Sequence, residues 1–111
     1  MEHRWGHRRE VSRAVQIGTR GGVVARGRIC NVSISGAFVA TLLPVRLYAY
    51  VTIHISAMVH GKRSATALEA QVVRRSAEGI GVEWCELAPE AIRSLLMVPT
   101  FRITRVAAAL R

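Results

Sequence analysis

The chain has 111 residues, half of them hydrophobic, which is enough for one domain with a buried core. Lys and Arg number 16 against 7 Asp and Glu, for a formal net charge of +9, and Lys62 is the only lysine. The planar guanidinium fork of arginine binds phosphate and guanine edges in pairs. This excess therefore indicates an anionic partner: a nucleotide, a nucleic acid or an acidic protein. A solvated basic surface is the alternative interpretation.

Several features bear on the compartment and on membranes. Residues 1–13 are polar and charged, unlike a signal peptide, and no apolar run approaches the roughly 20 residues that cross a bilayer. Cys30 and Cys85 have no zinc-site or redox-motif spacing, and both lie in apolar segments, so we expect buried, reduced thiols. We therefore expect a cytoplasmic protein without membrane insertion.

Short strands separated by turns follow one another along most of the chain. Residues 1–13 show no sustained periodicity, and we expect them to form an arginine-rich arm. After this arm, alternation of apolar and polar residues predicts six strands, over residues 14–17, 22–32, 36–42, 47–56, 65–75 and 80–85. The alternation is clearest in the fourth, where the expected inward face carries Leu47, Ala49, Val51, Ile53 and Ile55.

A helix is predicted near the C-terminal end. Pro89 suits the first helical position because its φ angle is fixed, and Ile92, Leu95 and Leu96 form an apolar stripe at helical spacing. Val98 and Pro99 end this helix. Six short strands with this spacing predict an all-β domain over residues 14–98, a small antiparallel barrel or sandwich, followed by a tail over residues 99–111.

One stretch breaks the alternation between the second and third predicted strands: residues 31–36, Asn-Val-Ser-Ile-Ser-Gly. The Asn31 amide can donate and accept hydrogen bonds, the Ser33 hydroxyl can donate one, and Gly36 allows close approach to the backbone. The arm upstream carries three arginines: Arg4, Arg8 and Arg9. Arginines above a small polar platform suit a planar anionic ligand. Alternatively, Asn31 and Ser33 are ordinary turn residues that bond their own backbone.

In this order, the motifs resemble those of a PilZ domain, the bacterial receptor module for cyclic di-GMP. That family has an Arg-x-x-x-Arg pair near its start, here Arg4 to Arg8, followed by an Asp/Asn-x-Ser-x-x-Gly motif, here residues 31–36. Residues 79–84 also look like the family's closing strand. The resemblance covers residues 2–98 and implies a six-stranded antiparallel PilZ-type β-barrel with one C-terminal α-helix.

A second arginine pair also fits the spacing, because Arg9 and Arg13 are as far apart as Arg4 and Arg8. The 23 residues from Arg8 to Asn31 leave room for one full strand and its turn. With the other pair, Arg13 would fall at the start of that strand. We therefore favour Arg4 and Arg8.

The resemblance implies a receptor that binds cyclic di-GMP and passes the signal to an effector protein in trans, in motility, biofilm or exopolysaccharide control. It implies six ligand-binding residues: Arg4, Arg8, Arg9, Asn31, Ser33 and Gly36. Guanine offers O6 and N7 as paired acceptors for an arginine fork, which suits this ligand. One alternative is a PilZ-fold adaptor that does not bind the nucleotide. Another is a small basic barrel that binds nucleic acid, which the scarcity of aromatic residues disfavours.

Two aromatic and two basic residues complete the candidate set. Phe38 and Trp84 lie in apolar strand segments and are expected to be buried. Arg74 and Arg75 end the fifth predicted strand, where they either extend the basic site or face solvent.

Catalytic and metal sites are not expected. No Ser/His/Asp or Cys/His arrangement stands in a recognisable motif, and no phosphate-binding glycine loop precedes a helix. The chain contains no Asp, which argues against a Mg²⁺ or Ca²⁺ site, and its four histidines lack metal-ligand spacing. We therefore expect no enzyme activity and no cofactor.

Overall fold

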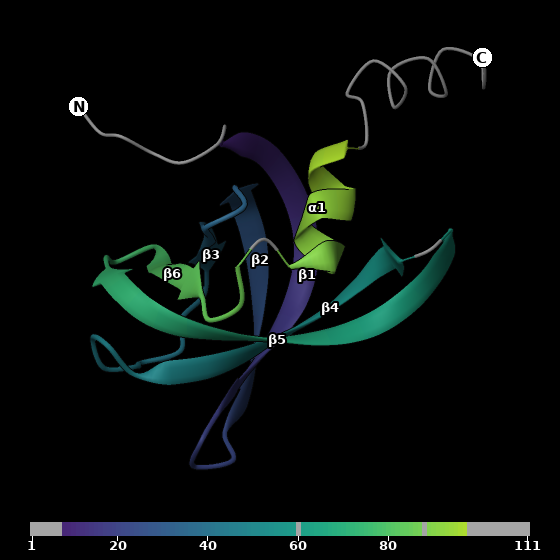
Figure 1. Ribbon diagram of the computed structural model, residues 1–111. Coiled ribbons are helices and arrows are strands. Elements are labelled where there is room, and N and C mark those ends of the chain that lie inside the picture. Colours follow the sequence, from purple (N-terminus) through teal and green to yellow (C-terminus); the bar gives the residue numbers. More distant parts are fainter. Residues whose placement is uncertain (1–7, 60, 88, 98–111) are drawn as a thin grey trace, which may run out of the picture.

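The computed structural model describes residues 8–59, 61–87 and 89–97, which form a closed antiparallel barrel with one helix (Figure 1). The elements are β1 (Arg9–Thr19), β2 (Val24–Val32), β3 (Gly36–Ala40), β4 (Tyr50–Val59), β5 (Lys62–Arg75), β6 (Gly79–Trp84) and α1 (Glu90–Met97). Around the barrel the strands follow the order β1-β2-β3-β6-β5-β4, and β4 pairs with β1 to close it. The predicted six-stranded barrel with a C-terminal helix is confirmed.

The first strand is longer than predicted. It was expected over residues 14–17, but β1 begins at Arg9, which pairs with Val32 at the end of β2. Residues 9–13 of the predicted arm therefore belong to the barrel. Val11 packs against the core in this extension, and pairing with β2 stabilises a strand beyond the residues whose own sequence favours it.

Three predicted segments lie partly outside the described residues. The parts outside are residues 1–7 of the predicted arm, His60 of the predicted turn before the fifth strand, and residues 98–111, where the helix stop and the tail were predicted. Gly61 in the β4–β5 turn has a φ angle of 77°, a backbone conformation that glycine adopts readily.

Alternation places one side of each strand in the barrel core. The core consists of side chains from all six strands and α1: Val15, Ile17, Ile29, Val32, Ala37, Val39, Val51, Ile53, Ile55, Leu68, Ala70, Val72, Ile80, Val82, Trp84, Ile92 and Leu95. The burial of Trp84 and the predicted inward direction of Val51, Ile53 and Ile55 are thus confirmed. Leu47, which was expected on the same face, is exposed and lies before the start of β4. Burial of this much aliphatic surface is the main force that stabilises the fold.

The prediction that both cysteines are buried is wrong. Cys30 is half-buried, because a bulge between Ile29 and Asn31 interrupts the alternation of β2 just where Cys30 stands. Cys85 follows the last residue of β6 and is exposed.

The two ends of the barrel are closed differently. At one end α1 packs Ile92 and Leu95 into the core, which confirms the predicted apolar stripe. Toward the other end, where the tip of the β1–β2 hairpin lies in Figure 1, the chain leaves β3 through residues 41–46. Leu43 and Val45 of this connection pack against the core. Apolar side chains therefore cover the core at both ends of the barrel.

Candidate functional site

Residues 33–36 form a tight turn between β2 and β3, and Ser33 organises it. The Ser33 amide donates to the Gly36 carbonyl at 2.8 Å. The Ser33 hydroxyl accepts from the amides of Ser35 at 3.2 Å and Gly36 at 3.3 Å. Its side chain is 1% exposed. The hydroxyl thus bonds the turn's own backbone, as the alternative interpretation of Ser33 expected, whereas Ser35 is exposed.

Trp84 fixes this turn to the end of β6. Its indole Nε1 group donates to the Ser33 carbonyl at 3.1 Å, and its backbone amide donates to the Ser35 carbonyl at 2.9 Å. The ring itself is buried in the core. Trp84 therefore holds the 33–36 turn in a fixed position relative to the barrel core.

Replacing Trp84 by phenylalanine is expected to lower the free energy of unfolding by about 1–3 kcal/mol, because the Ser33 carbonyl would lose its buried donor. Phenylalanine keeps an aromatic ring in the core. Urea unfolding followed by circular dichroism measures the change. A loss below about 0.5 kcal/mol, the range of neutral surface substitutions, would show that the indole bond does not anchor the turn.

Glycine at position 36 is required by the barrel itself. Gly36 pairs with Glu83, and a Cβ atom at position 36 would lie 2.1 Å from the Val82 carbonyl oxygen. No side chain fits at that distance from backbone, so β3 and β6 can approach here only through glycine. The glycine of the motif therefore has a structural role whether or not a ligand approaches it.

Arg8 and Asn31 meet on the outward side of the barrel. The Arg8 Nη1 group donates to the Asn31 side-chain oxygen at 2.5 Å, although the two residues are 23 positions apart. Asn31 is paired with Glu10 of β1 and, through the bulge of β2, with Phe38 of β3. Two of the six predicted ligand-binding residues thus form one polar group beside the turn.

The two candidate arginine pairs differ in where their side chains lie. Arg13 donates from Nη1 to the Ser56 carbonyl of β4, so its guanidinium lies on the opposite side of β1 from β2. Arg9 is paired with Val32, whose side chain is in the core. The structure therefore brings Arg8, not Arg13, to Asn31, and Arg4 lies outside the described residues.

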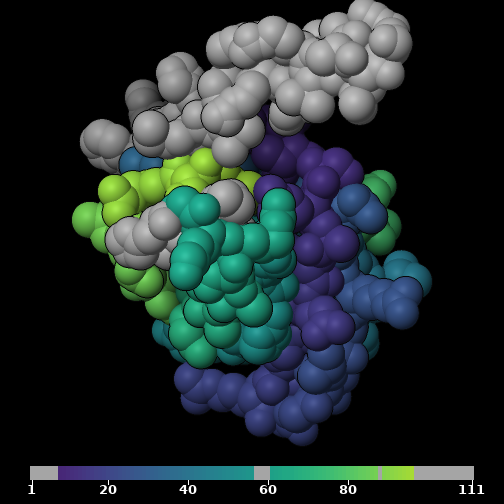
Figure 2. Space-filling view, turned by 90° about the vertical axis from the view of Figure 1, so that its right-hand side faces the viewer, coloured from purple at the N-terminus to yellow at the C-terminus, as the bar shows by residue number. Residues whose placement is uncertain are grey.

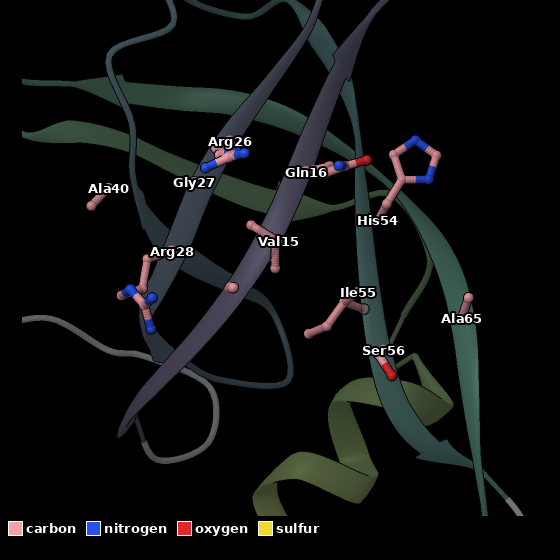
Figure 3. A pocket seen from close by; sticks show the side chains of 11 residues that line it. Val15, Gln16, Arg26, Gly27, Arg28, Ala40, His54, Ile55, Ser56 and Ala65 are labelled. Atoms are coloured by element: carbon pink, nitrogen blue, oxygen red, sulfur yellow. The ribbon is translucent and has the colours of Figure 1, made fainter.

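The basic surface continues along β1 and β2. Arg26 and Arg28 are exposed on β2, and the Arg28 Nη1 group donates to the Ser12 hydroxyl of β1 at 2.9 Å. Both arginines border an open hollow of about 630 Å³ over β1, with His54 and Ser56 of β4 on its other side (Figure 3).

Arg74 extends this surface over β6, an outcome that the sequence left open. A bulge between Val72 and Arg74 places Arg74 opposite Gly81. A Cβ atom at Gly81 would lie 3.3 Å from Arg74 Nε and 3.4 Å from Nη2, so the guanidinium covers the glycine. Phe38, the partner of Gly81 on β3, is half-buried between buried neighbours and faces outward, which corrects the prediction that it is buried.

We define the arginine face by six exposed charged residues on or beside β1, β2, β5 and β6: Arg8, Arg26, Arg28, Arg74, Glu10 and Glu83. Four arginines against two glutamates leave the face positive. It has the charge and the planar donors to bind a small anion that also carries rings.

The part of the chain that the structure describes shows neither a metal-binding cluster nor a helix that could span a membrane. It contains no group of three or more His, Cys, Asp or Glu residues that could hold a metal ion. None of its helices has both the length and the apolar character that spanning a bilayer requires.

Comparisons with known proteins agree with this architecture. A small antiparallel barrel with a C-terminal helix is also the fold of the PilZ domain of CeSA from a cellulose-synthesizing bacterium, solved by crystallography. The two structures superpose with a TM-score of 0.64 at 20% sequence identity, over 88% of this chain and 98% of that one. No curated protein sequence matches the chain.

The family follows from the sequence match. The model of the PilZ domain matches residues 2–97, nearly the whole chain. The chain therefore belongs to the PilZ domain family, which confirms the resemblance carried by residues 31–36 and the arginine pair.

Proposed function

We propose that this chain is a receptor that binds cyclic di-GMP on the arginine face and passes the signal to an effector protein in trans. The contact of Arg8 with Asn31 carries the proposal, because it brings an arginine fork and an amide to the outward edge of the turn. Membership of the PilZ family supports the choice of ligand. The cellular role would be control of motility, biofilm formation or exopolysaccharide synthesis. The proposal includes no catalytic step and no cofactor.

The chemistry of cyclic di-GMP suits this face. Each guanine offers O6 and N7, which accept two parallel hydrogen bonds from one guanidinium, and each phosphate can accept the same pair. Arg8 supplies such a fork and the Asn31 amide supplies a further donor. Arg4 is proposed to complete the clamp. Arg9 is not placed there, because it pairs with the core residue Val32 and so lies on the other face of β1 from Glu10.

Ser33 and Gly36 have an indirect role in this proposal. The Ser33 hydroxyl is buried and already bonds the turn, and Gly36 permits the pairing of β3 with β6. Both residues therefore hold the shape that presents Asn31 and the exposed Ser35 to the ligand.

Arg74 is expected to contribute to the same site. Replacing it by alanine should weaken cyclic di-GMP binding by about three- to tenfold, the loss of one hydrogen bond or stacking contact. Arg75 is the matched control. It has the same charge and exposure, but it pairs with Ile80 and lines a different hollow. Equal effects of Arg74→Ala and Arg75→Ala in fluorescence titrations would mean that only net charge matters.

Isothermal titration calorimetry of the full chain with cyclic di-GMP tests the proposal, with GTP as the control ligand. We expect micromolar or tighter binding of cyclic di-GMP and no heat from GTP. No heat from either ligand, with a folded protein, would refute the receptor role and favour an adaptor that binds only proteins.

Titration with a single-stranded oligonucleotide distinguishes the receptor function from the alternative of a nucleic-acid-binding barrel. Binding through many phosphate contacts weakens steeply as salt rises. Tighter binding of the oligonucleotide than of cyclic di-GMP, with that steep salt dependence, would contradict the proposal.

A further inference from the structure

Within the part of the chain that the structure describes, the large exposed hydrophobic side chains are concentrated at one end. Among the described residues seven large hydrophobic side chains are exposed, and six belong to the β1–β2 hairpin or to the connection from β3 into β4: Val23, Val24, Leu42, Leu47, Tyr48 and Tyr50. The seventh is Leu87. Figure 2 shows the hairpin tip protruding at the end away from α1. An exposed apolar surface of this kind marks an interaction site more often than a scattered set does.

A groove of about 530 Å³ runs between the hairpin and the connection, and we call it the tyrosine groove. Its apolar lining includes Val23, Val45 and Tyr50. Two exposed arginines, Arg20 and Arg46, also line it, and no acidic residue does. The groove is thus apolar within and positively charged at its rim.

The groove is held in place by hydrogen bonds and by one ring contact. The Tyr48 amide donates to the Val72 carbonyl at 2.6 Å, and the Val72 amide donates to the Ala49 carbonyl at 2.8 Å. The guanidinium carbon of Arg20 lies 5.3 Å from the centre of the Tyr50 ring, within cation–π range. A surface that is already ordered loses little conformational entropy when a partner binds.

We infer that the tyrosine groove is the docking site of a segment of a partner protein in which a bulky apolar side chain is flanked by carboxylates. The apolar lining suits the side chain, and Arg20 and Arg46 suit the carboxylates. Tyr and Arg are also the residue types that most often dominate the energy of protein interfaces.

Charge argues against the other occupants. Two copies of this chain docked groove to groove would bring Arg20 and Arg46 against the same residues of the second copy, with no carboxylate in the lining to pair with them. The phosphate of a nucleotide could bind the two arginines, but the apolar lining offers few hydrogen-bonding groups to the sugar of that nucleotide.

This inference rests on the proposed receptor function, which requires an effector, and it assigns the effector a surface and a chemistry. The groove is distinct from the arginine face, since the two share no residue. An experiment on the groove that uses no nucleotide can therefore fail or succeed independently of cyclic di-GMP binding.

The test is a nuclear magnetic resonance titration of the full ¹⁵N-labelled chain with three short capped peptides. The first carries a Trp-Leu pair flanked by glutamates, the second has lysines in place of the glutamates, and the third has serines in place of Trp-Leu. The first peptide should shift the amides of residues 19–21, 43, 45, 46 and 49–51, and the other two peptides should bind about tenfold or more weakly.

Two pairs of variants locate the binding. Tyr50→Ala should weaken binding of the first peptide by about tenfold. Leu87→Ala, at an exposed hydrophobic residue outside the groove, should leave that binding unchanged. Arg46→Glu should weaken binding of the first peptide by about tenfold. Arg63→Glu makes the same charge change on β5 and should change that affinity by less than about threefold.

Three results would overturn the inference. These are shifts that map to the arginine face instead of the groove, equal binding of the serine peptide, and affinities unchanged by Tyr50→Ala and Arg46→Glu. Each variant is compared by its amide spectrum with the unchanged chain, so a loss of binding through unfolding is recognised directly.

Discussion

Replacing Arg8 by alanine is expected to weaken cyclic di-GMP binding by about 30-fold or more. A hydrogen bond to a charged group contributes about 1.5–3 kcal/mol, and Arg8 is proposed to make at least one such pair with phosphate or guanine. Its contact with Asn31 places the fork at the turn before the ligand arrives. Calorimetric titration measures the change.

Three variants show whether the loss of affinity depends on the position of the arginine or only on its charge. Arg13→Ala should leave the affinity within about threefold, because Arg13 donates to the Ser56 carbonyl and not to Asn31. Arg63→Ala removes the same charge from an exposed position of β5 and should behave alike. Arg8→Lys keeps the charge without the bidentate fork and should recover only part of the affinity. A larger loss with Arg13→Ala than with Arg8→Ala would favour the other arginine pair.

Replacing Gly36 by alanine is expected to lower the free energy of unfolding by about 3 kcal/mol or more. The added methyl group would lie 2.1 Å from the Val82 carbonyl oxygen, which is backbone and cannot rotate away. β3 and β6 would have to separate beside the turn, with loss of their pairing. Chemical unfolding of the variant and the unchanged chain measures the difference.

Gly81→Ala is the matched control, because Gly81 is also a buried glycine of the β3–β6 pair. The closest neighbours of its added methyl group would be atoms of the Arg74 side chain at 3.2–3.4 Å, which can move. The cost should stay below about 1 kcal/mol, and displacement of Arg74 should weaken cyclic di-GMP binding. Similar stability of the two variants would contradict the steric role of Gly36.

Alternation in the sequence was sufficient to predict that there are six strands, though not all of their bounds, and to predict the inward side chains within β4 and α1. In β4 the burial of Val51, Ile53 and Ile55 follows directly from their spacing, and in α1 the burial of Ile92 and Leu95 does too. The start of β1 at Arg9 could not be predicted in this way, because it depends on pairing with β2 and not on local preference.

Two features of the site could be seen only in the structure. The bulges before Asn31 and Arg74 decide which side chains face outward, and no residue type in the sequence marks them. The motif identified Ser33 as a ligand contact, whereas its hydroxyl is buried in the turn. For Arg74 a signal existed: Gly81 on the neighbouring strand leaves room for a long side chain.

The tyrosine groove could not be predicted from the alternation pattern, because the pattern of residues 47–56 places Leu47 inward and extends the strand through Tyr48. Instead Tyr48 has a φ angle of 71°, β4 begins at Tyr50, and Leu47 is exposed. The left-handed backbone conformation of this one residue interrupts the expected strand, so that residues before Tyr50 form an exposed connection.

Cyclic di-GMP is proposed to bind at Arg8 and Asn31 on the outward side of the barrel. Mapping amide chemical shifts of the ¹⁵N-labelled chain during titration with cyclic di-GMP tests this claim most directly. We predict that the shifts concentrate at Arg8, Asn31, the 33–36 turn, Phe38 and Gly81, with residues 43–46 unchanged. Saturable shifts confined to the tyrosine groove, or no shifts at all, would contradict it.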